Sequence, residues 1–289
     1  KKVINLYTKK EKFKNEIADA KKFLNFIKKF SQNKIVIKDS YYLGYKWEKI
    51  VKKRVKNLVV IGDEVNTKHY SDFYINHSPD ILSLDKKLKL TLKKNNKINC
   101  KFLIGPDYAL FESNKKKKKI TSDYLFYNGG AGNLLEYEKI IKRLSKNFSN
   151  KINVVVGPFS KNSRKLQNKF EKIKNVRLIF KPESIINYLK GTKVFISSAG
   201  ISMFESSFQK IPTLLFKMNS NQNLTDKGYE NLGHYFCLSK NDLKNEEKIE
   251  KLLILMKDNY LGIKKIMKNN CLDTNLIKKN YKKKFKDIL

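Results

Sequence analysis

Arginine is scarce in this sequence of 289 residues, although 63 residues are basic and the formal net charge is +36. The four arginines are Arg54, Arg143, Arg164 and Arg177, and lysine supplies the remaining positive charge in every segment of the chain. Proteins that read a nucleic-acid sequence depend on arginine, whose side chain makes paired hydrogen bonds with guanine and phosphate. We therefore expect no specific nucleic-acid partner. The excess of lysine indicates a compositional bias of the chain. The electric field of these positive charges favours phosphorylated partners, which it attracts over about 10 Å.

Cysteine and long apolar runs are also scarce. Cys100, Cys237 and Cys271 have neither metal-site nor disulfide spacing, and each lies in or beside an apolar run. This pattern favours a reducing compartment and no metal. Because no apolar run approaches the roughly 20 residues that a membrane span needs, and no signal segment opens the chain, we expect a soluble, cytoplasmic protein.

Short β-branched runs alternate with amphipathic segments along the chain, which predicts parallel strands joined by helices. Strands are predicted near residues 2–7, 34–39, 57–63, 72–78, 100–105, 123–128, 152–157, 176–180, 194–198, 213–216 and 235–238. Helices are predicted near residues 11–30, 46–56, 134–148, 163–173, 183–190, 202–210 and 222–231.

Five consecutive lysines mark the expected boundary between two domains. A run of like charge without an apolar anchor is usually a solvated linker, so we place a linker at residues 115–122. It follows a Rossmann-like domain over residues 1–114 and precedes a doubly wound α/β domain over residues 123–240. Residues 241–289 predict a basic helical tail that packs on one or both domains.

Three loops of the second half follow strands, at the sheet edge where doubly wound domains bind ligands. "FYNGGAGN" (126–133) has three glycines that place backbone N–H groups at a helix start, which favours an anion, although a tight turn without a ligand explains it equally. It is neither the spaced dinucleotide fingerprint nor a P-loop. "ISSAGISMFES" (196–206) repeats the arrangement, and Glu205 either complements the helix dipole or accepts hydrogen bonds from a ribose. "FKMNSNQNLTDKG" (216–228) offers uncharged groups that suit a sugar or cap a helix.

Taken in order, these loops resemble the nucleotide-sugar half of GT-B-fold proteins. The closer resemblance is to the UDP-2,4-diacetamido-2,4,6-trideoxy-β-L-altropyranose hydrolases of pseudaminic acid biosynthesis, which are related in fold to the peptidoglycan N-acetylglucosaminyltransferases. The matching segments are "KDSYYLG", "IGDEVNTKHYSDFYIN", "GPDYALF", "YNGGAGN", "SSAGISMFES" and "NSNQN", spread over residues 34–232. The resemblance implies an α/β, GT-B-like fold of two Rossmann-like domains with parallel sheets, the first of them incomplete.

The resemblance also implies a role for each matching residue, and it implies no cofactor and no metal. Diphosphate contacts are expected from Gly129, Gly130, Ser198, Gly200, Ile201 and Ser202, ribose contacts from Glu205, and uracil contacts from Phe180 and Lys181. The sugar and β-phosphate are expected at Asn221 and Gln222, while Tyr41 lines the cleft from the N-terminal domain. Asn221 and Tyr41 are therefore the catalytic candidates. For Asp63, His69 and Asp72, which match only the family pattern, we expect structural roles.

One segment of the family pattern is missing. The hydrolases carry G-x-G-H-x-x-R after their first strand, and its histidine is thought to activate water, but no such segment occurs here. His234 follows a late helix and does not take that role, and we expect His69 and His77 to be structural. The chain is thus expected to begin inside the family pattern, shortened at its N-terminus.

The family reaction that this resemblance implies is hydrolysis of the bond between the anomeric carbon and the UDP oxygen, which releases UDP and a diacetamido hexose. Such a reaction needs a base for water and donors for the departing diphosphate. Because no base is identified, enzymatic activity is left open. The alternatives are a GT-B glycosyltransferase that uses a UDP-sugar donor, and a non-catalytic module that retains nucleotide binding or only the fold. A UDP-sugar is the expected partner of a chain that we expect to be monomeric.

Overall fold

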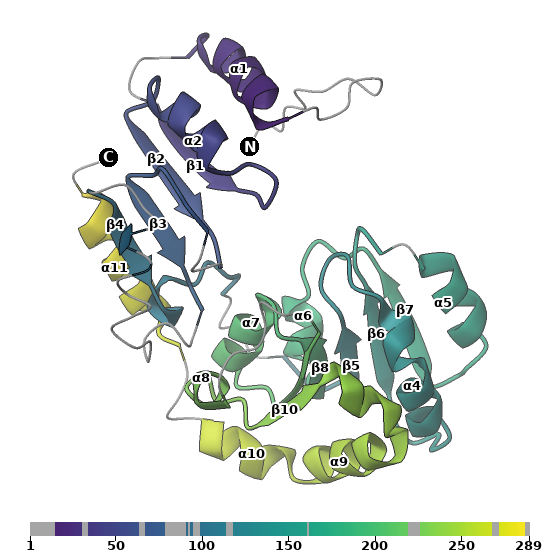
Figure 1. Ribbon diagram of the computed structural model, residues 1–289. Helices are drawn as coiled ribbons and strands as arrows, with labels where there is room; N and C mark the ends of the chain where they lie inside the picture. Colours follow the sequence, from purple (N-terminus) through teal and green to yellow (C-terminus); the bar gives the residue numbers. More distant parts are fainter. Residues whose placement is uncertain are drawn as a thin grey trace. The chain divides into compact units, whose positions relative to one another are not determined.

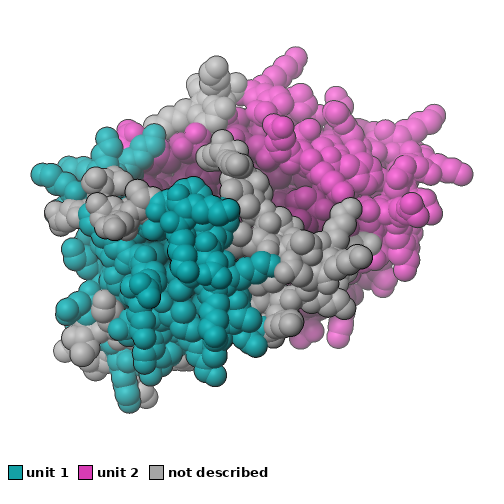
Figure 2. Space-filling model, turned by 90° about the horizontal axis from the view of Figure 1, so that it is seen from above, with its two compact units in different colours: residues 1–108, 278–289 teal, residues 109–277 magenta. Residues whose placement is uncertain are grey.

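The computed structural model describes residues 15–30, 34–63, 67–78, 91, 93–94, 99–113, 118–160, 162–218, 226–267 and 272–286. The chain divides into two compact units, coloured separately in Figure 2. Unit 1 comprises residues 1–108 and 278–289, and unit 2 comprises residues 109–277. Each unit is built on its own parallel sheet (Figure 1).

Unit 1 contains a four-stranded sheet in the order β1-β2-β3-β4, with every neighbouring pair parallel. The strands are β1 (Ile35–Asp39), β2 (Asn57–Ile61), β3 (Phe73–Asn76) and β4 (Lys101–Ile104). The helices are α1 (Glu16–Ile27), α2 (Tyr45–Lys52), the 3₁₀ turn η2 (Pro106–Tyr108) and, from the end of the chain, α11 (Thr274–Phe285).

Helices cover both faces of this sheet, because successive strand side chains point to opposite sides. On one face, Leu58 and Val60 pack with Trp47 of α2 and with residues of α1. On the other face, the ring of Phe73 stacks on that of Phe285 of α11, with ring centroids 4.9 Å apart. The apolar runs of β2 and β3 are thereby buried on both sides, as expected for a parallel sheet.

Unit 2 contains a six-stranded parallel sheet in the order β10-β9-β8-β5-β6-β7. The strands are β5 (Ser122–Tyr127), β6 (Ile152–Val156), β7 (Val176–Phe180), β8 (Thr192–Ser198), β9 (Thr213–Lys217) and β10 (Phe236–Ser239). The intervening helices are η3 (Leu134–Tyr137), α4 (Glu138–Ser145), α5 (Ser163–Phe170), α6 (Ile186–Leu189), α7 (Ser202–Gln209) and α8 (Asp226–Glu230), followed by η5 (Lys240–Lys244), α9 (Glu246–Asp258) and α10 (Tyr260–Ile266). The first strand of this unit therefore lies beside the fourth, and the strand order reverses between β5 and β8.

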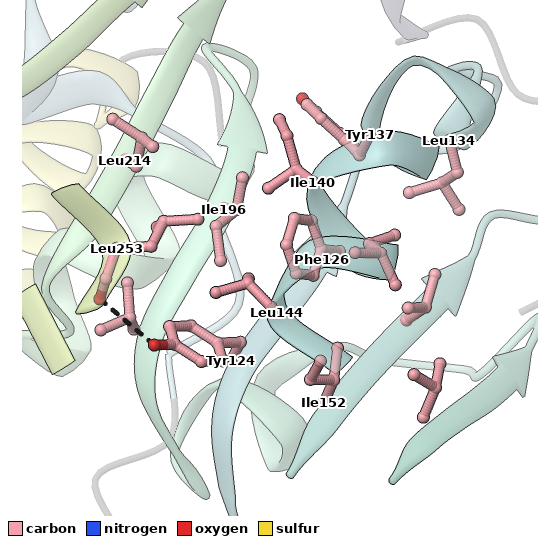
Figure 3. Close-up of a cluster of buried hydrophobic side chains, with 14 of the residues drawn as sticks. Tyr124, Phe126, Leu134, Tyr137, Ile140, Leu144, Ile152, Ile196, Leu214 and Leu253 are labelled. Atoms are coloured by element: carbon pink, nitrogen blue, oxygen red, sulfur yellow. Dashed lines mark hydrogen bonds between the residues drawn. The ribbon is translucent and has the colours of Figure 1, made fainter. Parts of the chain in front are cut away.

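The larger core of unit 2 lies between the sheet and helices α4, α5 and α9. Figure 3 shows Phe126 and Ile196 from the sheet facing Ile140 and Leu144 of α4. The Tyr124 hydroxyl donates a hydrogen bond of 3.4 Å to the carbonyl oxygen of Leu253 in α9, which ties the C-terminal helices to the sheet. Helices α6, α7 and α8 pack on the opposite face.

The predicted fold class is confirmed: both units are Rossmann-like, with parallel sheets and covering helices. The segment predicted as one helix over 134–148 is instead a 3₁₀ turn followed by α4, because the Asn133 side chain accepts the Leu135 N–H and caps a tight first turn. The strand predicted near residues 2–7 lies outside the described residues. Of the predicted basic tail, α9 packs in unit 2, whereas residues 278–289 group with unit 1.

Candidate functional site

The candidate site lies at the carboxyl ends of β5 and β8 in unit 2. These strands are neighbours, yet the chain leaves them toward opposite faces of the sheet, into α4 and α7. Such a switch point opens a crevice between two loops and is where doubly wound sheets bind their ligands. The two loops here are residues 128–133 and residues 199–201.

In and beside the first loop, the backbone packs so closely that some positions have no room for a side chain. A Cβ atom on Gly132 would overlap the carbonyl oxygen of Asn128, and one on Gly157 would overlap the carbonyl oxygens of Gly129 and Gly130. Gly129 has a φ of 72°, which disfavours other residues. The loop is braced by the Asn128 Nδ2 group, which donates to the Asn133 carbonyl oxygen at 3.2 Å. The turn is therefore rigid, and its small residues keep side chains away from the sheet edge.

The second loop presents backbone rather than hydroxyl groups. Ser198 and Ser202 are buried, and the Ser202 Oγ lies 3.1 Å from the Ser197 Oγ, so this hydroxyl is engaged inside the protein. Gly200 has no heavy atom within 4 Å of where a Cβ would stand. Ile201 is 43% exposed and immediately precedes α7. The Gly200, Met203 and Phe204 N–H groups already donate to backbone carbonyl oxygens, so an anion at this end would meet the N–H groups of Ile201 and Ser202 and the positive end of the helix dipole.

Glu205 lies in the first turn of α7, on the same side of the sheet as Tyr127 of β5. Burial raises the pKa of Glu205 to about 7; the Glu112 backbone N–H, which donates to the carboxylate, lowers it, and the Glu112 charge adds to the rise. Burial, with the charge of Glu205, also raises the pKa of Tyr127. Sequence reasoning missed Glu112 and Tyr127. Glu112 directly follows the matching segment "GPDYALF", and Tyr127 lies inside "FYNGGAGN".

Phe180 and Lys181 end β7 two strands away from β5. Phe180 is 43% exposed, and Lys181 adopts a φ of 45°, a conformation that non-glycine residues rarely adopt. The Lys181 N–H donates to the carbonyl oxygen of Val156 in β6 at 2.9 Å, which holds this turn against the neighbouring strand. Lys181 therefore places one strained backbone position at the same carboxyl edge as the two loops, whereas the other such position, Lys210, ends α7.

His234 supports α7 from within the protein. It is 1% exposed, and its Nε2 lies 2.8 Å from the carbonyl oxygen of Met203 in the first turn of α7. Burial lowers the pKa of His234 to about 4, so the ring is neutral at pH 7 and its Nε2–H donates to that carbonyl. The histidine fixes the helix end and does not face a ligand.

The remaining predicted site residues are Asn221, Gln222 and Tyr41. Asn221 and Gln222 lie outside the described residues, so their predicted roles stay predictions. Tyr41 belongs to unit 1, where it follows β1, is 74% exposed and donates from Oη to Asp63 Oδ2 at 2.7 Å. The structure thus brings the glycines, the two serines and Glu205 to one edge of unit 2, and it places Tyr41 in the other unit.

His69 and Asp72 are engaged in contacts that hold unit 1 together. His69 Nδ1 lies 2.9 Å from Glu48 Oε1, and Lys38 Nζ lies 2.6 Å from the same oxygen, with all three side chains buried. Asp72 accepts the Leu58 N–H at 2.8 Å. These contacts join β1, β2 and α2 to the segment before β3.

Neither a metal centre nor a membrane helix is present in the part of the chain that the structure describes. There, no three His, Cys, Asp or Glu side chains are grouped so as to hold a metal ion. Within the same residues, no helix combines the length and apolar character needed to cross a bilayer.

Sequence comparison finds one distant relative, and no family model matches the chain. The uncharacterized protein MJ1062 of Methanocaldococcus jannaschii is 23% identical over 203 residues, which cover 65% of this chain and 41% of that protein. The chain therefore spans less than half the length of this relative.

Solved structures share the fold of this chain over most of its length. UGT89C1 of Arabidopsis thaliana, complexed with UDP, superposes with a TM-score of 0.64 at 10% identity, covering 94% of this chain and 77% of that one. MnaA of S. aureus, also in a structure with UDP, gives a TM-score of 0.59 at 14% identity, covering 95% and 80%. MurG of Acinetobacter baumannii gives 0.53 at 9% identity, covering 91% and 80%. The chain has the GT-B fold.

Proposed function

We propose that unit 2 binds a UDP-sugar at the carboxyl ends of β5 and β8, and that the protein cleaves the bond between the anomeric carbon and the UDP oxygen. The observation that carries this proposal is the pair of backbone-lined loops at the switch point, with Glu205 beside them. The loop at residues 128–133 and the start of α7 would hold the diphosphate, and Glu205 the ribose diol. Structural neighbours with UDP bound support the choice of nucleotide.

Water is the proposed acceptor, and the sugar is a UDP-linked 2,4-diacetamido-2,4,6-trideoxy hexose of nonulosonic (pseudaminic) acid biosynthesis. This choice depends on the resemblance of the segments from "KDSYYLG" to "NSNQN". Backbone N–H groups at two helix starts stabilise the negative charge that develops on the diphosphate as the C–O bond breaks. The second candidate is transfer of the sugar to a hydroxyl acceptor, which the shared GT-B fold favours equally.

Gly200→Ala tests the nucleotide site. The added methyl group meets open space in the protein, so the free energy of unfolding should change by no more than about 0.5 kcal/mol. It would obstruct a diphosphate that approaches the backbone, so affinity for UDP, measured by calorimetry, should fall at least about tenfold. Gly262→Ala in α10 is the matched control, because its methyl group also meets open space. Equal UDP affinity in both variants would contradict the proposed site.

Product analysis separates the two reactions. The wild-type protein is incubated with a UDP-linked 2,4-diacetamido hexose, or with UDP-GlcNAc, in the absence of any acceptor. Stoichiometric release of UDP and free sugar supports hydrolysis. Release that requires an added sugar acceptor supports transfer.

A further inference from the structure

Helices α9 and α10 follow one another at the surface of unit 2 and have one side turned to the protein (Figure 1). On that side, Ile249, Leu253 and Met256 of α9 belong to the larger core of unit 2. Only Asn259 separates the two helices, and Met267 directly after α10 is buried as well. The side that packs on the sheet therefore has its apolar residues, and the opposite side faces water.

The side that faces water is also apolar. Its exposed aliphatic residues, which we name the aliphatic face, are 38–66% exposed: Ile254, Leu255, Leu261 and Ile266. A helix at a protein surface normally presents polar residues to water, whereas a helix that is apolar all round is covered on every side. Exposed apolar patches of this kind mark contacts with another protein or with a membrane.

The charges around the aliphatic face favour a negatively charged partner. The two helices contain five lysines and four acidic residues. Each acidic side chain is in an ion pair: Glu246 with Lys139 and Glu250 with Arg143 of α4, Glu247 with Lys251, and Asp258 with Lys257. Since α4 supplies the partners of two of these acids, the lysines of α9 and α10 leave an excess of positive charge at this surface.

A lipid bilayer with anionic headgroups fits this combination better than a protein partner does. The centres of protein interfaces are enriched in aromatic residues and arginine and depleted in lysine. The aliphatic face contains only leucine and isoleucine, and the exposed Lys251 and Lys265 lie on the same two helices. Helices that lie in a membrane surface combine aliphatic side chains with lysines, and residues 246–266 extend over about 30 Å along such a surface.

We propose that the aliphatic face docks unit 2 on the surface of a membrane that contains anionic lipids. The four aliphatic side chains enter the boundary between the headgroups and the acyl chains, and the lysines of α9 and α10 contact the headgroup phosphates. The net charge of +36 adds an attraction that acts before contact. The inference does not depend on the proposed UDP-sugar activity.

The test is cosedimentation of the full chain with vesicles of equal parts phosphatidylglycerol and phosphatidylcholine. The wild-type chain should bind these vesicles, and it should bind pure phosphatidylcholine more weakly. The double variant Leu255→Gln/Leu261→Gln should lower the partition coefficient at least about tenfold, because two aliphatic side chains no longer leave water. Lys265→Gln should lower the partition coefficient about fivefold on the anionic vesicles and leave it unchanged on pure phosphatidylcholine.

Leu110→Gln is the matched control. Leu110 is also 53% exposed, but its neighbour Ala109 packs on the face of the sheet opposite α9. This variant should keep the wild-type partition coefficient. Because every substituted side chain is exposed, the midpoint of thermal unfolding should be the same in all variants, which checks that each one folds.

Three outcomes overturn the proposal. A double variant that keeps the wild-type partition coefficient shows that lysine charge alone attracts the chain to the vesicles. A wild-type chain that stays in the supernatant removes the membrane contact altogether. A wild-type chain that is a dimer by ultracentrifugation without lipid, and a monomer as the double variant, shows that the aliphatic face pairs two copies of the chain instead.

Discussion

At the scale of single residues, Glu205 lies in an environment unlike that of an ordinary surface carboxylate. Its carboxylate receives the Glu112 backbone N–H but is buried close to the Glu112 charge, so its pKa is raised to about 7. A carboxylate at a ribose site must be ionised to accept two hydroxyl donors. The proposed ribose contact therefore predicts that nucleotide affinity depends on pH near neutrality.

We predict that the affinity for UDP-GlcNAc rises with pH between about 6 and 8. Below its pKa the carboxyl is protonated, so the affinity falls by up to about tenfold per pH unit if only the ionised form binds ribose. UDP-GlcNAc is the suitable ligand because its phosphates carry no proton that titrates in this range. Calorimetry at several pH values measures the effect.

Two variants give the controls for this pH dependence. Glu205→Gln should bind more weakly and show no dependence on pH between 6 and 8. Glu112→Gln removes the neighbouring negative charge, which lowers the pKa of Glu205, so the rise in affinity should move to lower pH. A wild-type affinity that is constant over the range would contradict a ribose contact by this carboxylate.

The sequence predicted those parts of the candidate site that directly follow a strand. Gly129 and Gly200 could be placed because a parallel sheet aligns the ends of its strands, so spacing along the chain predicts proximity in space. Glu112 could not be placed, since it reaches Glu205 through the path of the segment after η2. The contact between Tyr41 and Asp63 could not be predicted either, because spacing alone does not reveal that β1 and β2 are neighbours in the sheet.

At the scale of elements, the buried contacts among Lys38, Glu48 and His69 join β1, α2 and the segment before β3. Glu48 also accepts the Tyr70 N–H at 2.5 Å, so both of its carboxylate oxygens are engaged. Burial alone would raise the pKa of Glu48, but the hydrogen bonds and charges of His69 and Lys38 together lower it. The carboxylate is thus ionised and fully bonded inside unit 1.

We predict that Glu48→Gln lowers the free energy of unfolding of unit 1 by about 3–5 kcal/mol, because it leaves the buried Lys38 without its charged partner. Glu247→Gln in α9 is the control: its ion pair with Lys251 is exposed, so the change should be below about 1 kcal/mol. Denaturant unfolding of both variants measures the difference.

Acid should reduce the effect of Glu48→Gln. The pKa of Glu48 is lowered in the folded state, so the stabilisation from its ionised form is complete above its ordinary pKa of 4.5 and is lost as the pH falls through the lower folded value. The stability gap between wild type and variant should therefore narrow below about pH 4.5. A gap that stays constant in acid would show that packing, rather than charge, accounts for the loss.

At the scale of the whole molecule, the C-terminal residues of the chain belong to the same unit as its N-terminal residues. Residues 278–289 group with residues 1–108, and α11 covers the sheet face opposite α1 and α2. Tyr281 Oη donates to the Tyr108 carbonyl oxygen at 2.7 Å, and Phe285 stacks on Phe73. Without this helix, the apolar face formed by β2, β3 and β4 would be open to water.

We predict that removing residues 278–289 destabilises unit 1 and leaves unit 2 folded, because the larger core of unit 2 is built from residues 124–256. Phe285→Ala should lower the stability of unit 1 by about 2–3 kcal/mol, since the ring is half-buried. Hydrogen exchange resolved by peptide would show faster exchange in β2 and β3 and no change in β5 and β8. UDP affinity should remain at the wild-type value, because the proposed nucleotide contacts lie within unit 2. Loss of protection in β5 or β8 would instead mean that the two units fold as one cooperative body.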